Sequence, residues 1–87
     1  MEVKVFLVER KMENLKRISH HTPLYIETFD KCWEMIENCM IKNHEKVTPK
    51  FVRRLEILEA LIFGFLESAT TIESLDFAEK TIFSLAR

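Results

Sequence analysis

This sequence of 87 residues contains very few of the residues that make tight turns. Gly64 is its only glycine, and Pro23 and Pro49 are its only prolines. Hairpin turns in β-sheets generally need Gly or Asn at positive φ, so one glycine supports a multi-stranded sheet poorly. A glycine-rich phosphate loop is also excluded, and with it nucleotide hydrolysis by that route. The sequence therefore predicts a mainly α-helical protein.

The length limits the chain to one domain, over residues 1–87, because domains usually need on the order of 100 residues or more. So small a chain buries only about 60 to 65% of its unfolded surface and is marginally stable alone. Since 47% of its residues are hydrophobic, we expect an additional apolar surface to be covered by a second copy. The composition therefore favours a homodimer.

Several features favour a reduced, cytoplasmic protein that does not enter a membrane. The sequence contains no charged leader followed by an apolar core and a cleavage site. Its most apolar stretch, Ala60–Leu66, is far too short to span a bilayer. Cys32 and Cys39 lie seven residues apart on one predicted helix, a rise of roughly 10 Å, which exceeds the reach of a disulfide.

Two Thr-Pro pairs mark the beginnings of two helices. Thr22 and Thr48 are suited to the N-cap, and the proline that follows each is suited to the first helical position. Helical periodicity after the first pair predicts a helix over 23–43, and the stripe after the second pair predicts another from Pro49. The later turns of this second Thr-Pro helix are apolar nearly all round, which is typical of a helix buried on more than one side. We expect the second side to form a dimer or partner interface made by Ile57, Leu61, Phe63, Phe65 and Leu66.

The two ends of the chain are less clearly patterned. Residues 2–8 alternate like a β-strand that pairs with its copy across a dimer, yet they also fit a heptad seam, and both interpretations remain open. Helix is predicted over Lys11–Ser19, and a further short helix over about 71–86. The predicted fold is a small antiparallel bundle of three to four helices.

The residue types that usually bind metals or catalyse reactions do not form a recognisable site. His20 and His21 are adjacent and do not face one point, and zinc motifs place cysteines closer than Cys32 and Cys39. No carboxylate precedes a histidine by three residues, as a di-iron helix motif requires. We therefore predict no cofactor, no metal and no enzymatic activity.

A basic cluster surrounds the turn between the two Thr-Pro helices: Lys42, Lys46, Lys50, Arg53 and Arg54. In a helix-turn-helix protein, the first residues of the second helix read DNA bases, and Lys50, Arg53 and Arg54 would be suitably placed. A ribbon-helix-helix dimer is a second DNA-binding arrangement, with residues 2–8 as its strand. The acidic residues Glu45, Glu56 and Glu59 near the cluster argue against the first arrangement, because they reduce its positive charge. The second requires a strand with one polar side, whereas Phe6 and Val8 lie on the same side as Lys4.

The sequence favours a non-enzymatic interaction or regulatory module that acts as a homodimeric helical bundle. The alternative is a dimeric DNA-binding protein that uses the basic turn. The second Thr-Pro helix is expected to lie near any contact with a partner.

Overall fold

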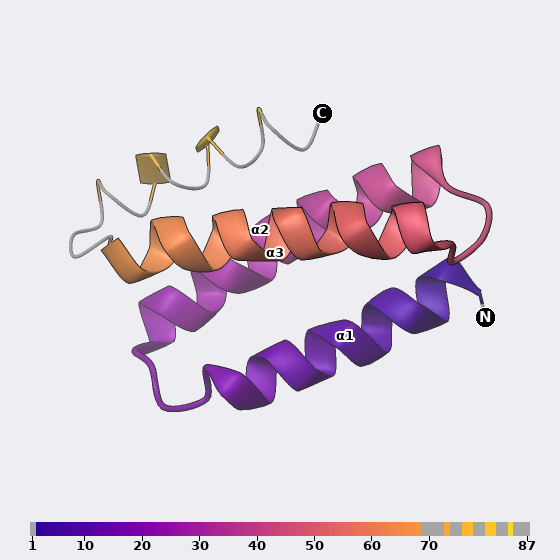
Figure 1. Cartoon of the computed structure of the whole chain (residues 1–87). Coiled ribbons are helices and arrows are strands. Elements are labelled where there is room, and N and C mark those ends of the chain that lie inside the picture. The colour runs from indigo at the N-terminus through magenta and orange to yellow at the C-terminus, as the bar shows by residue number, and fades with distance from the viewer. Residues whose placement is uncertain (1, 69–72, 74–75, 78–79, 82–83, 85–87) are drawn as a thin grey trace.

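The computed structural model describes residues 2–68 together with 73, 76–77, 80–81 and 84. Its three principal helices are α1 (Val3–Arg17), α2 (Pro23–Asn43) and α3 (Pro49–Ser68). Successive helices run in opposite directions and lie side by side, as Figure 1 shows. The prediction of a mainly α-helical bundle is confirmed for this part of the chain. The helix expected over about 71–86 lies largely outside the described residues.

Both Thr-Pro helices begin where the sequence indicates. The Thr22 hydroxyl accepts a hydrogen bond from the Tyr25 backbone N–H (3.3 Å), and the Thr48 hydroxyl accepts one from the Phe51 N–H (3.1 Å). Each bond satisfies a backbone donor that the first turn of a helix leaves unpaired. The predicted helix over 23–43 is confirmed, as is the start of the next helix at Pro49.

The alternative of a β-strand over residues 2–8 is wrong, because these residues belong to the beginning of α1. A strand would place Val3, Val5 and Leu7 on one face. The structure instead buries Val3 and Leu7 and leaves Val5 45% exposed. None of the described residues forms a strand that this segment could pair with, whereas a helix packs one face of the segment against the other two helices.

The hydrophobic core is centred on α2, which packs against both other helices. Phe29 stacks on Trp33 (ring centroids 5.9 Å apart) and on Phe63 of α3 (5.5 Å), and both Phe29 and Trp33 are completely buried. By contrast, no Cα of α1 lies within 8 Å of a Cα of α3 in the described part of the chain. The space between α1 and α3 is therefore bridged by long side chains.

No helix in the described part of the chain is both long enough and apolar enough to cross a membrane.

Candidate interaction surface

The outward face of α3 carries a groove that combines basic and apolar side chains. Its volume is about 280 Å³, and its lining consists of Lys50, Arg53, Arg54, Ile57, Leu58 and Leu61. These residues recur at steps of three and four, so the helical period brings them to one side of α3. The groove therefore joins part of the predicted basic cluster to part of the predicted partner interface.

The apolar side chains of the groove differ in how much surface they offer. Ile57 is 56% exposed, Leu61 is half-buried and Leu58 belongs to the core. A single exposed apolar residue is common on protein surfaces. Here, however, Ile57 and Leu61 are neighbours one turn apart, so they form a continuous apolar strip over the buried Leu58.

The cations around this strip are not engaged elsewhere in the described part of the chain. Lys50, Arg53 and Arg54 are exposed, and none of them forms an ion pair with a described residue. Three exposed positive charges beside an apolar strip favour a ligand that is both anionic and apolar. Lys42 and Lys46 are also exposed but do not line the groove.

The structure places the remaining predicted interface residues elsewhere. Phe63 and Leu66 are buried in the chain's own core, and Phe65 is half-buried and packs against that core. Phe63 stacks on Phe29 of α2, and the Arg17 guanidinium of α1 lies 4.4 Å from the centre of its ring. Phe63 and Leu66 therefore offer little surface to a second copy of the protein, and the predicted interface stays a prediction.

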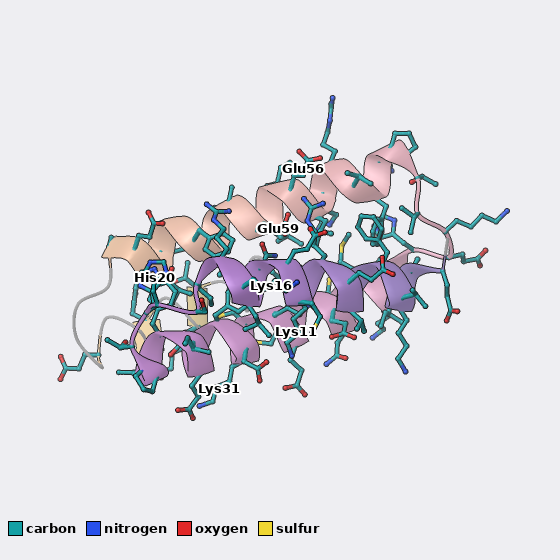
Figure 2. The ribbon with its side chains drawn as sticks, turned by 90° about the horizontal axis from the view of Figure 1, so that it is seen from below. Lys11, Lys16, His20, Lys31, Glu56 and Glu59 are labelled. Carbon is teal, nitrogen blue, oxygen red and sulfur yellow. The ribbon has the colours of Figure 1, made fainter. Side chains whose placement is uncertain are left out.

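A polar seam between α1 and α3 is the feature that the sequence interpretation missed. The Arg10 guanidinium donates to both carboxylate oxygens of Glu59, with Nε 2.9 Å from Oε2 and Nη2 2.8 Å from Oε1. The Asn14 amide donates to Oε2 at 2.6 Å. Figure 2 shows Glu59 between the ribbons of α3 and α1. We call Arg10, Asn14 and Glu59 the seam triad.

The chemistry of the seam triad is that of a structural ion pair. The hydrogen bond to Glu59 raises the pKa of the Arg10 guanidinium, and burial opposes this effect. A cleft of about 630 Å³ runs along the seam and is lined by Glu13, Arg17 and Glu56 as well as the triad. Both signs of charge are mixed in its lining, and the Glu59 carboxylate is already occupied by three donors. The Glu59 carboxylate is therefore held as a structural anion, whereas Glu13 and Glu56 in the lining are exposed.

The histidines and cysteines do not gather into a metal site within the described residues, where no group of three or more His, Cys, Asp or Glu side chains has suitable geometry. His20 and His21 contact each other, with ring centroids 4.4 Å apart, and His21 stacks on Tyr25 at 4.0 Å. His44 packs edge-on against Phe51 at 5.2 Å, which anchors the turn between α2 and α3. These rings serve as packing groups at the ends of the helices.

Comparison with known proteins gives no functional assignment, since no family model, curated protein or solved structure matches this chain.

Proposed function

We propose that this chain is a non-enzymatic protein-interaction module and that the groove on α3 binds an acidic amphipathic helix of a partner protein. The observation that carries the proposal is the combination of three exposed cations, Lys50, Arg53 and Arg54, with the exposed apolar strip of Ile57 and Leu61. An amphipathic helix with acidic flanks complements both the charge and the apolar surface.

The dimensions of the groove suit a helix better than an extended strand. Its lining extends from Lys50 to Leu61, about 16 Å along the axis of α3. An α-helical partner of about three turns covers that length and presents apolar anchors at steps of three and four. No sheet edge is present in the described residues to pair with a strand, so a helical ligand is the proposed occupant.

The expected affinity is low. The partner would bury only the exposed parts of two apolar side chains, each contributing about 1 kcal/mol, together with a few surface ion pairs of about 0.2 to 1 kcal/mol each. Such a contact falls among small, transient interfaces. These contributions sum to about 3 to 5 kcal/mol, which corresponds to a dissociation constant on the order of millimolar.

A titration with a synthetic acidic amphipathic helix of about four turns tests this proposal. Following the methyl signals of Ile57 and Leu61 by NMR, we expect saturable shifts that vanish with a scrambled peptide. Arg54→Glu should weaken binding at least about tenfold, since a like charge replaces an attractive one at the groove. Lys42→Glu is the matched control, because Lys42 is exposed but lies outside the groove. Equal binding by wild type and Arg54→Glu would contradict the proposal.

DNA binding is the second candidate, and it rests on the exposure of all five basic residues around the turn. Two observations oppose it. The ribbon-helix-helix arrangement requires a strand where α1 lies. The two helices of a helix-turn-helix motif cross at a steep angle, whereas α2 and α3 lie alongside each other in opposite directions (Figure 1). Titration of duplex DNA at low salt should therefore show no saturable binding. Tight binding that Arg53→Ala and Arg54→Ala abolish would replace the first proposal with this one.

A further inference from the structure

A second apolar surface lies on α1, on the side roughly opposite the core. Val5, Val8 and Met12 are 45%, 46% and 56% exposed, and they follow one another at steps of three and four. The core-facing residues of the same helix, Val3 and Leu7, are buried. Steps of three and four are the spacing of a coiled-coil seam. We call Val5, Val8 and Met12 the outer stripe.

Charged residues border the outer stripe, and the sign of their charge changes along α1. Glu2, Glu9 and Lys16 lie seven residues apart along one edge, so the edge is acidic at the start of α1 and basic at its end. All three are exposed, and none forms an ion pair with a described residue. On the other edge, Lys11 is already paired with Asp30 of α2. When two copies of this edge run in opposite directions, Glu2 of each therefore faces Lys16 of the other.

From this arrangement we infer that the outer stripe binds a second copy of the chain, with the two α1 helices antiparallel about a twofold axis. In such an isologous contact the same patch is used twice. Val8 of one copy then packs beside Met12 of the other, and Glu2 lies opposite Lys16 at both ends. A parallel pair would instead bring Lys16 next to Lys11 of the other copy. Opposed helix dipoles also favour the antiparallel pair.

One position opposes the antiparallel contact and makes it testable. Glu9 lies midway between Glu2 and Lys16, so the twofold axis brings it near its own copy. Replacing Glu9 with Gln removes a like-charge contact and should strengthen the dimer about twofold to fivefold. In a parallel pair Glu9 would face Lys4, and the same substitution would weaken the dimer. The two arrangements therefore predict opposite effects of Glu9→Gln.

Sedimentation equilibrium of the full chain from micromolar to millimolar concentration measures the contact. We expect a reversible dimer, weak because a single helix pair makes a small interface. Val8→Lys should weaken association at least about tenfold while the helical circular dichroism is unchanged, since Val8 is exposed in the single chain. Ile57→Lys, in the groove on α3, is the control and should leave the dimer intact.

The same experiment separates failure of this inference from failure of the proposed function. A chain that stays monomeric throughout the concentration range overturns the inference and leaves the groove on α3 unaffected. The inference is also overturned if Ile57→Lys dissociates the dimer and Val8→Lys leaves it intact. The second copy would then occupy the α3 groove. Exchanging the charges of Glu2 and Lys16 tests the antiparallel arrangement directly. Glu2→Lys and Lys16→Glu should each weaken the dimer, and the variant that carries both should restore it only if the helices are antiparallel.

Discussion

The interior around α2 and the seam between α1 and α3 hold the same bundle together by different means. In the interior, Phe29, Trp33 and Ile36 are completely buried, and the helices pack through apolar and aromatic contacts. At the seam the two backbones stay further apart, and Arg10 and Asn14 reach across to Glu59. Apolar burial is non-directional, whereas a shared carboxylate requires particular partners. We infer that the interior supplies most of the stability and that the seam specifies how α1 is aligned with α3.

The most damaging change to the interior is expected to be Trp33→Ala. Truncating a fully buried Trp removes its transfer free energy and leaves a cavity, at a cost of about 3 to 5 kcal/mol. That is a large part of the total stability of a small domain, about 5 to 15 kcal/mol. Urea denaturation followed by circular dichroism measures the loss. The control is Ile41→Ala on the same helix, where Ile41 is 42% exposed and the change should stay within about 0.5 kcal/mol. Similar losses in the two variants would contradict the role of the interior.

The seam is best tested with a double-mutant cycle on Arg10 and Glu59. Each single substitution, Arg10→Met or Glu59→Leu, breaks the ion pair and leaves the remaining partner with fewer hydrogen bonds, and should cost about 1 to 3 kcal/mol. The double variant should cost less than the sum of the two, by about 0.5 to 3 kcal/mol of coupling in urea denaturation.

The exposed pair of Lys31 and Glu27 provides the matched control for this cycle. Its charged atoms lie 3.8 Å apart on the surface of α2, and an exposed pair four residues apart on a helix is worth only about 0.3 to 0.5 kcal/mol. A coupling energy between Arg10 and Glu59 as small as that of the control would show that the seam does not specify the alignment of α1.

The parts of the fold that depend on local chemistry were predictable from the sequence. A Thr-Pro pair supplies both an N-cap and a proline at the first helical position, so it marks a helix start wherever the rest of the protein lies. The beginning of α1 was not predictable in this way, because residues 2–8 combine strand-like alternation with helical spacing. Contacts with α2, distant in the sequence, decide between the two.

The candidate surfaces were only partly predictable for a related reason. The sequence shows that the later turns of α3 are apolar nearly all round, but it does not show which neighbour covers each side. Phe63 and Leu66 turn inward, and Ile57 remains exposed. The seam did leave a signal: Asn14 and Glu59 are polar residues at buried positions of otherwise apolar helical faces. A buried polar residue usually has a partner, and two such positions on different helices indicate a pair.

Tyr25 allows the smallest expected effect of the apolar interior to be tested. An apolar interior should oppose ionisation of a side chain at its border. Burial raises the pKa of the Tyr25 hydroxyl, the negative charge of Glu67 raises it further, and the Arg17 guanidinium opposes both. The hydroxyl has no hydrogen-bond partner among the described residues. Removing it in Tyr25→Phe should therefore change the free energy of unfolding at neutral pH very little.

At alkaline pH the same substitution should have a measurable effect. Above the ordinary tyrosine pKa of about 10, the unfolded chain loses the Tyr25 proton before the folded chain does, because the folded pKa is raised. The folded state then binds more protons than the unfolded state, so its stability falls as pH rises through this range. Urea denaturation at about pH 8 and about pH 11 should show a smaller loss for Tyr25→Phe than for wild type. All other ionisable groups are the same in the two proteins, so equal losses would mean that the interior does not hold Tyr25 in its neutral form.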